Sequence, residues 1–256
     1  MTRPKVGLVL GSGSARGISH LGVLQVFKEE GVPVDVVVGC SAGAVIGAFY
    51  AAGTDLYMVE KLLKTYPVMK QLLDVKMPRT GFIKGDKVLE FLSLLTKNLN
   101  FEDLPVKLAV VATDLEKGKQ VVFAEGQVAP AVRASISIPG VFSPYHYQGM
   151  ILVDGAVIER LPAGVAKGFK CDMIIGVDVK GGREAKIGNI FDVLIQSIEI
   201  MEEEIRRRTL IDVDILIQPE VSHIGSFKFD LAEEAVRLGR EAAYRHLPKI
   251  KRALQL

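Results

Sequence analysis

The sequence predicts an α/β protein in which a mainly parallel central sheet is flanked by helices. Three observations support this prediction. Short apolar runs alternate with segments of helical periodicity, several runs end in glycine-rich turns, and the 49% hydrophobic content is mostly aliphatic, with 7% aromatic residues and no Trp. A length of 256 residues suffices for one large core, so we expect a single domain over residues 1–256.

The N-terminal part of the chain repeats a strand, a turn and a helix. Val6–Leu10 is a short apolar run that ends in a glycine-rich loop, and apolar residues at helical spacing follow from Ile18 to Gly31. Val34–Val38 is a second β-branched run, and Ala42–Ala52 is rich in residues that helices accept. Strands that alternate with helices in this way favour parallel pairing.

The rest of the chain continues the alternation, with one antiparallel hairpin around Glu116–Lys119. The predicted strands are Val106–Thr113, Gln120–Ala124, Tyr145–Val153, Met173–Val179 and Val213–Ile217. The predicted helices are Leu56–Tyr66, Lys87–Thr96, Val128–Ile138, Ile190–Leu210 and Leu231–Arg245.

Val36–Gly53 is an uncharged stretch of eighteen residues with two interpretations. As one piece it reaches the lower length limit of a membrane span, and Gly39, Gly43 and Gly47 form a small-residue ladder. Divided at Gly39-Cys40-Ser41-Ala42-Gly43, it becomes a strand, a sharp turn and a helix, the arrangement of a G-x-S-x-G nucleophile elbow. The β-branched start favours the elbow, which would expose Ser41 at a strained turn beside a helix N-terminus.

Gly11-Ser12-Gly13-Ser14-Ala15-Arg16-Gly17 follows the first predicted strand. A dinucleotide-binding loop is one interpretation, but Arg16 stands at the third glycine position of G-x-G-x-x-G and the P-loop lysine is missing. The other interpretation is an oxyanion hole, in which the backbone N–H groups of Gly13 and Ser14 face a developing negative oxygen. Arg16 would then either attract an anionic head group or brace the loop by pairing with a carboxylate.

Asp154 follows a predicted strand and precedes Gly155 and Ala156. Taken alone, Asp-Gly indicates a turn, and the A-S-I-S-I-P segment Ala134–Pro139 indicates the end of a helix. A carboxylate at a strand end is nevertheless placed where α/β sheets usually carry their sites.

Together and in this order, the four segments resemble the patatin-like phospholipase family. That family is built on a glycine-rich oxyanion loop, a G-x-S-x-G serine, an A-S-x-x-x-P segment and a D-G-G/A aspartate. The resemblance covers nearly the whole chain and is greatest to short, single-domain bacterial members related to the catalytic domain of neuropathy target esterase. Ser12 and Ser14 stand where many members have glycine, and Ala156 stands where plant patatins have a third glycine. These changes leave the backbone donors in place.

The resemblance implies a three-layer α/β/α fold and a Ser-Asp dyad. In such a dyad Ser41 is the nucleophile and Asp154 accepts its proton, while Gly13 and Ser14 hold the oxyanion of an acyl-transfer reaction. The implied activity is that of an esterase, lysophospholipase or phospholipase A acting on lipid or fatty-acyl esters through an acyl-enzyme.

Other assignments remain open from the residues alone. His223 lies after Asp154 and completes a Ser, Asp, His order, with Asp114 as a second candidate to orient it; His20 and His146 lie closer to the motifs. We expect each histidine to be structural or solvent-facing. A serine peptidase on the same elbow, or a binding protein that has lost the chemistry, are the two other function classes.

Composition restricts the partners. A net charge of +2 gives no field that would attract nucleic acid, and Cys40 and Cys171 have neither metal-ligand nor disulfide-framework spacing. We therefore expect no metal and no cofactor, and a cytoplasmic protein whose lipid substrate would bring it to the inner face of the membrane. Cys40 is expected to be tucked into the fold, as the neighbour of an elbow serine.

Two further segments carry expectations about the surface. Val68–Ile83 contains apolar residues that either line an acyl channel, rest on a membrane or pack on the core as a flap. Glu202–Glu204 precede Arg206–Arg208 at a spacing of four residues, which predicts a solvated helix face with internal ion pairs or, less economically, a patch for lipid head groups.

Overall fold

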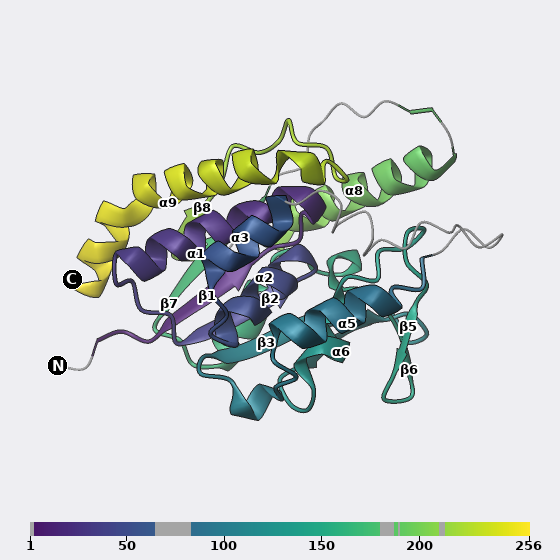
Figure 1. The fold of residues 1–256 in the computed structure, drawn as a ribbon, viewed down its shortest axis with the longest axis horizontal. Coiled ribbons are helices and arrows are strands. Elements are labelled where there is room, and N and C mark those ends of the chain that lie inside the picture. Colours follow the sequence, from purple (N-terminus) through teal and green to yellow (C-terminus); the bar gives the residue numbers. More distant parts are fainter. Residues whose placement is uncertain (1–2, 65–82, 180–186, 189, 210–212) are drawn as a thin grey trace.

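The computed structural model describes residues 3–64, 83–179, 187–188, 190–209 and 213–256. Within these residues an eight-stranded sheet forms the centre of the molecule, with helices packed against it (Figure 1). The strands are β1 (Val6–Leu10), β2 (Val36–Cys40), β3 (Lys107–Asp114), β4 (Lys119–Phe123), β5 (Tyr145–Tyr147), β6 (Met150–Asp154), β7 (Met173–Val177) and β8 (Ile215–Ile217). The α-helices are α1 (Ser19–Glu29), α2 (Ala42–Ala51), α3 (Leu56–Lys64), α5 (Asp86–Leu95), α6 (Val128–Ser135), α7 (Ala163–Gly168), α8 (Ile190–Thr209) and α9 (Ala232–Leu254).

The middle of the sheet is parallel, as the alternation of strands and helices predicts. Strands β3, β2, β1, β7 and β8 are adjacent in that order, and Leu8 of β1 lies between Val37 of β2 and Ile175 of β7. Every residue of β1, β2 and β7 is buried. Continuous β-branched runs are typical of strands covered on both faces, which explains why the sequence pattern identified them.

Antiparallel pairing is confined to the region around β3. Strand β4 occupies one edge of β3, while β2 and β6 share its other edge end to end. Cys40, the last residue of β2, pairs with Val111, and Asp154, the last residue of β6, pairs with the adjacent Ala112. The two strands therefore approach each other along β3 and bring the residues at their carboxyl ends together.

The two faces of the sheet are covered unequally. Helices α1, α2, α6 and α9 bury the larger apolar cluster against one face, and Figure 1 shows α1, α3 and α9 packed along one another on this side. A smaller cluster on the opposite face includes Val9, Val38 and Ile174 and packs against Ala166 of α7. The central sheet flanked by helices confirms the predicted fold class.

Three predicted elements differ from the structure. Tyr145–Val153 is not one strand but the hairpin β5–β6, because Gln148 and Gly149 adopt φ values of 50° and 74° and form a tight turn. The helix predicted over Val128–Ile138 already ends at Ser135, and the last helix continues beyond Arg245 to Leu254 with Pro248 inside it. Except for Ile83, the segment Val68–Ile83 lies outside the described residues.

Candidate active site

Ser41 occupies the sharp turn between β2 and α2, so the membrane-span interpretation of Val36–Gly53 is wrong. Its backbone has φ 52° and ψ −121°, a conformation that is strained for a residue with a side chain. Three hydrogen bonds hold it there: the Ser41 N–H donates to Ser135 Oγ at 2.8 Å, and the N–H groups of Ala44 and Val45 donate to the Ser41 carbonyl. The strain is therefore balanced by contacts with α6 and α2.

The glycines around Ser41 are required by close packing. A Cβ on Gly43 would lie 2.1 Å from the carbonyl oxygen of Leu10 in β1, and a Cβ on Gly39 would lie 2.5 Å from Cα of Ala44. Both distances are far below any van der Waals contact. The small residues that suggested a membrane dimer thus allow α2 to leave the sheet at the elbow.

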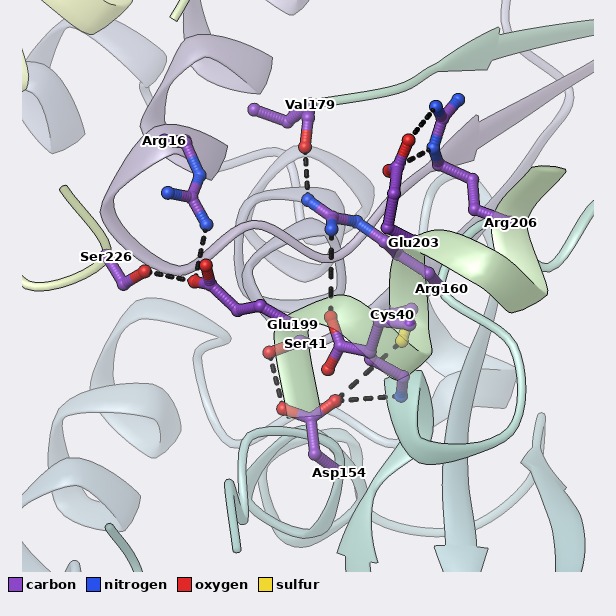
Figure 2. A network of polar contacts seen from close by, with 12 residues as sticks. Arg16, Cys40, Ser41, Asp154, Arg160, Val179, Glu199, Glu203, Arg206 and Ser226 are labelled. Carbon is purple, nitrogen blue, oxygen red and sulfur yellow. Dashed lines mark hydrogen bonds and ion pairs between the residues drawn. The ribbon is translucent and has the colours of Figure 1, made fainter. Parts of the chain in front are cut away.

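Asp154 lies beside Ser41, as the end-to-end arrangement of β2 and β6 dictates. Ser41 Oγ donates a hydrogen bond of 2.6 Å to Asp154 Oδ2, and both residues are at least 96% buried (Figure 2). The other carboxylate oxygen, Oδ1, accepts from the Ala156 N–H at 2.9 Å and faces Cys40 Sγ at 3.9 Å. These residues are 113 positions apart in the sequence, and the fold brings them into contact.

The backbone of Asp154 is fixed as firmly as its side chain. Its N–H donates to the Ser137 carbonyl at 3.0 Å, and its carbonyl accepts from Thr113 Oγ1 at 3.0 Å. Ser137 belongs to the same segment as Ser135, so Ala134–Pro139 links the turn at Ser41 to the strand that ends at Asp154. This segment has a structural task that its sequence, taken alone, did not indicate.

Burial sets the protonation of the two groups beside Ser41. Loss of solvation raises the pKa of Asp154 to about 6, although the hydrogen bonds from Ser41 and Ala156 and the charge of Arg160 oppose the rise. Burial likewise raises the pKa of the Cys40 thiol well above its ordinary value. Asp154 is therefore poised to exchange a proton near neutral pH, while Cys40 stays a thiol.

The glycine-rich loop Gly11–Gly17 passes directly over Ser41. Neighbouring backbone groups anchor it: the N–H groups of Gly11, Ser12 and Ala15 donate to carbonyl oxygens elsewhere in the fold. Among the described residues, no hydrogen bond engages the backbone N–H groups of Gly13 or Ser14. Ser14 and Ser41 line the same two pockets, and Gly13 lines the second of them.

His20 and Arg16 brace this loop from below. Burial lowers the pKa of His20 to about 4, so its ring is neutral and Nε2–H donates to the Gly11 carbonyl at 2.7 Å. Arg16 is buried and donates to the Ile224 carbonyl and to Glu199 of α8, the latter at 2.8 Å. Of the two expectations for Arg16, the structure shows the bracing ion pair.

Two pockets meet at Ser41. The first is apolar and has a cavity volume of about 140 Å³. Its lining includes Val45, Phe49, Phe91, Leu92, Phe142 and Phe229, which come from α2, α5 and neighbouring loops. The second is smaller, with a cavity volume of about 40 Å³, and we call it the polar pocket because Asp154, Arg160, Glu199 and Glu202 line it together with apolar residues such as Ile195 and Phe227. A bound molecule could place one end in each pocket across Ser41.

The charges on α8 are distributed differently from the sequence prediction. Glu202 is largely buried and lies 3.7 Å from Arg160, and burial raises its pKa to about 7. Arg206 is buried too and donates to Asp178 at 2.9 Å (Figure 2 shows its partner Glu203). The solvated face predicted for Glu202–Arg208 is therefore wrong for Glu202 and Arg206, although Glu204 and Arg207 do form an exposed pair at 2.9 Å.

Arg160 and Glu202 are site residues that sequence reasoning missed. Arg160 follows the Asp154 motif in a loop, where a charged residue normally indicates exposure, yet it is 2% exposed. The sequence of α8 places Ile190, Leu194, Ile200 and Met201 on one face, but only the structure shows that this apolar face is the exposed one.

None of the four histidines lines a pocket that contains Ser41. His223 is half-exposed and lies 3.1 Å from Glu234, while His146 is exposed on β5. Asp114 accepts hydrogen bonds from the N–H groups of Glu116 and Lys117 in the β3–β4 turn. Neither His223, His146 nor Asp114 lines a pocket with Ser41.

The described residues contain neither a metal-binding cluster nor a membrane-spanning helix. In this part of the chain, no group of three or more His, Cys, Asp or Glu side chains could hold a metal ion. Likewise, none of the described helices has both the length and the apolar content needed to cross a membrane.

Comparison with known proteins gives consistent results. The sequence model of the patatin-like phospholipase family matches residues 8–167. An uncharacterized NTE family protein of Mycobacterium tuberculosis is 37% identical over 179 residues, which cover 70% of this chain and 50% of that protein. The lysophospholipase NTE1 of Saccharomyces cerevisiae is 32% identical over 179 residues, which cover 68% of this chain and 11% of the yeast protein. The chain thus spans about half the length, or less, of these relatives.

Among solved structures, VipD from Legionella pneumophila has the same fold. The two structures superpose with a TM-score of 0.56 at 17% sequence identity, covering 97% of this chain and 67% of VipD. ExoU of Pseudomonas aeruginosa, in complex with SpcU, gives a TM-score of 0.53 at 17% identity, covering 99% of this chain and 52% of the other.

Proposed function

Because this chain belongs to the patatin-like phospholipase family, we propose that it is a serine acyl-ester hydrolase that cleaves lipid or fatty-acyl esters through an acyl-enzyme. The observation that carries the proposal is the 2.6 Å hydrogen bond from Ser41 to Asp154, with Ser41 in the lining of an apolar pocket. A serine hydroxyl becomes an effective nucleophile when an adjacent base can take its proton. A pocket lined by aliphatic and aromatic side chains is suited to a fatty-acyl chain.

In the proposed first step, Ser41 Oγ attacks the ester carbonyl carbon while its proton passes to Asp154. The carbonyl oxygen gains negative charge and accepts hydrogen bonds from the N–H groups of Gly13 and Ser14, which have no other partner among the described residues. Collapse breaks the bond to the alcohol oxygen, and Asp154 returns its proton to that oxygen. The alcohol leaves, and the acyl group stays on Ser41.

In the second step, a water molecule replaces the alcohol. Asp154 accepts one proton from the water as its oxygen attacks the acyl carbon, and the oxyanion again lies against the glycine-rich loop. Breaking the acyl bond to Ser41 Oγ releases the fatty acid, and the proton held by Asp154 restores the Ser41 hydroxyl. Asp154 suits both directions of transfer because its pKa of about 6 lies near the pH at which the reaction would run.

Activity-based labelling tests the proposal directly. We expect a fluorophosphonate probe to label the wild-type protein at Ser41, and Ser41→Ala to lose both the label and the hydrolysis of p-nitrophenyl acyl esters. Ser197→Ala is the matched control, since it removes an exposed serine hydroxyl that lines neither pocket. Labelling that persists in Ser41→Ala, or cleavage of peptides with no cleavage of acyl esters, would contradict the proposal.

A lipid substrate also bears on where the protein acts. We propose a cytoplasmic protein with peripheral contact to the inner face of the membrane. Fractionation of cells that express the full-length protein tests this: we expect it in the soluble fraction and in a membrane fraction from which salt washing releases it. Recovery only in a secreted or a detergent-requiring fraction would refute it.

A further inference from the structure

The polar pocket beside Ser41 has a composition that the hydrolysis step itself does not require. It shares Ser14, Ser41 and Ile138 with the apolar pocket, and its other walls come from the glycine-rich loop, α8 and the loop at Ser226. The two pockets are thus neighbours on either side of Ser41, Ser14 and Ile138. An ester centred on Ser41 would place its acyl part on one side and its alcohol part on the other.

Five ionisable side chains line the polar pocket: Arg16, Arg160, Asp154, Glu199 and Glu202. With every group ionised, two positive charges face three negative ones, so the pocket carries a net charge of about −1. Each arginine is already engaged. Figure 2 shows Arg16 paired with Glu199, at 2.8 Å, and Arg160 donating to the Val179 carbonyl. Arg16 also donates to the Ile224 carbonyl, and Arg160 lies 3.7 Å from Glu202.

Resting on the proposed esterase function, we propose that this pocket binds the leaving alcohol and selects neutral, hydroxyl-bearing alcohols such as glycerol over alcohols that carry a phosphate. Carboxylates only accept hydrogen bonds, so the hydroxyl groups of a glycerol moiety are complementary to Glu199 and Glu202. A phosphate offers only acceptors and negative charge, and both arginines that could balance it are already paired with glutamates. Placing it here adds negative charge to a pocket whose ionised lining is already net negative.

Ser226 and Ser14 add to this hydroxyl-binding character. Ser226 Oγ donates to Glu199, and Ser14 Oγ donates to the Ser226 carbonyl at 2.5 Å. These contacts connect the pocket wall to the loop whose N–H groups would hold the oxyanion. A bound hydroxyl that donates to Glu199 would therefore lie within one hydrogen-bonded network with the reacting carbonyl.

The experiment compares two substrates that share an oleoyl chain and differ in the alcohol. Monooleoylglycerol and oleoyl lysophosphatidic acid are presented in the same mixed detergent micelles at pH 8, where Glu202, with its pKa of about 7, is mostly ionised. We expect wild-type kcat/KM to be higher for monooleoylglycerol by roughly tenfold or more, because the phosphate monoester carries about two negative charges at this pH and the pocket disfavours them. The ratio of the two values cancels any difference in the amount of active protein.

Glu202→Gln sharpens the test because it removes one negative charge and keeps the side-chain shape. Arg160 then lacks its carboxylate, so we expect the ratio to fall by about tenfold. Glu204→Gln, an exposed change on the same helix, should leave the ratio as in wild type. Glu199→Gln provides a second substitution in the pocket should Glu202→Gln fold poorly, and it should move the ratio in the same direction.

The outcomes separate the two proposals. In the first case, both lipids are hydrolysed and the hydrolysis depends on Ser41. A wild-type preference for the phosphate-bearing substrate, or a ratio that is unchanged in Glu202→Gln and Glu199→Gln, would then overturn the alcohol-pocket proposal and leave the esterase function intact. No Ser41-dependent hydrolysis of either lipid or of p-nitrophenyl esters would overturn the esterase function itself.

Discussion

The two pockets on either side of Ser41 are built by different physical means. The apolar pocket is an extension of the hydrophobic core, lined by residues such as Phe49 and Leu92 that the helical periodicity of α2 and α5 turns inward. The polar pocket is lined by charged side chains whose burial is balanced by ion pairs with α8. The apolar pocket is therefore specified by the hydrophobic pattern of the sequence, and the polar pocket by electrostatic pairs between individual side chains.

The largest effect should come from Asp154, which lines the polar pocket and accepts the hydrogen bond from Ser41. We expect Asp154→Asn to lower kcat by about 10²–10⁴-fold, because the amide cannot accept the Ser41 proton. His223→Ala should keep most of the activity, since that side chain is half-exposed and pairs with Glu234. Steady-state hydrolysis of a p-nitrophenyl ester by both variants provides the measurement. The reverse pattern would show that a histidine triad operates.

The next largest effect concerns the contribution of the arginines of α8 to stability. Arg206 and Arg207 are neighbours on α8, but Arg206 is buried against Asp178 whereas Arg207 is exposed. We expect Arg206→Met to lower the free energy of unfolding by about 3 kcal/mol, because it leaves the buried Asp178 carboxylate without its cation. Arg207→Met should change it by less than about 0.5 kcal/mol. Urea unfolding followed by circular dichroism measures both, and equal losses would mean that the buried pair is not what holds α8 on the site.

A smaller effect should follow from narrowing the apolar pocket. Val45 lines it from α2, and Val45→Phe would reduce the length available to an acyl chain. We expect kcat/KM for a palmitoyl ester to fall by roughly tenfold relative to a butyryl ester, since a few lost methylene contacts amount to this ratio. Leu94→Phe adds the same ring at an exposed position of α5 and serves as the control. Equal losses with both esters would place the acyl chain elsewhere.

The same contrast explains what could be predicted from the sequence. Strand β1 and helix α2 were predicted to within a residue, because apolar runs and glycine stops directly encode buried elements. The hairpin β5–β6 was missed, since Gln148 at positive φ gives no turn signal of the kind that Asn-Gly would give. Hydrophobic patterning therefore predicts the core elements and the helices that line the apolar pocket.

The pairing of Ser41 with Asp154 has another origin. Neither periodicity nor spacing indicated it, and it entered through the resemblance of four segments to one family. The structure supplies a physical reason, because Val111 and Ala112 pair with the ends of two different strands. Arg160 and Glu202 could not be identified because a buried ion pair depends on contacts between distant segments, and local sequence assigns such residues to the surface.

The pH dependence of activity tests whether burial controls the pKa of Asp154. Asp154 must be ionised to accept the Ser41 proton, and its pKa is raised by burial to about 6, so activity should fall on the acid side of that value. Between pH 7 and pH 5 we expect kcat/KM for a neutral ester to decrease by about tenfold, as the ionised fraction does. An acid limb near pH 4 would mean that Asp154 is solvated as an ordinary surface carboxylate.

Stability should change in the opposite direction over the same interval. A carboxyl whose folded-state pKa is raised favours the folded state while it is protonated, and this contribution is lost as the pH rises from its ordinary value of 3.8 to about 6. Asp154→Asn stays neutral at every pH, so its free energy of unfolding should match that of wild type near pH 4 and exceed it by about 3 kcal/mol at pH 7. Unfolding curves of both proteins at the two pH values measure the difference. If Asp154→Asn has a higher free energy of unfolding than wild type at pH 7 but has lost activity, the ionised Asp154 destabilises the folded protein and is nevertheless required for catalysis.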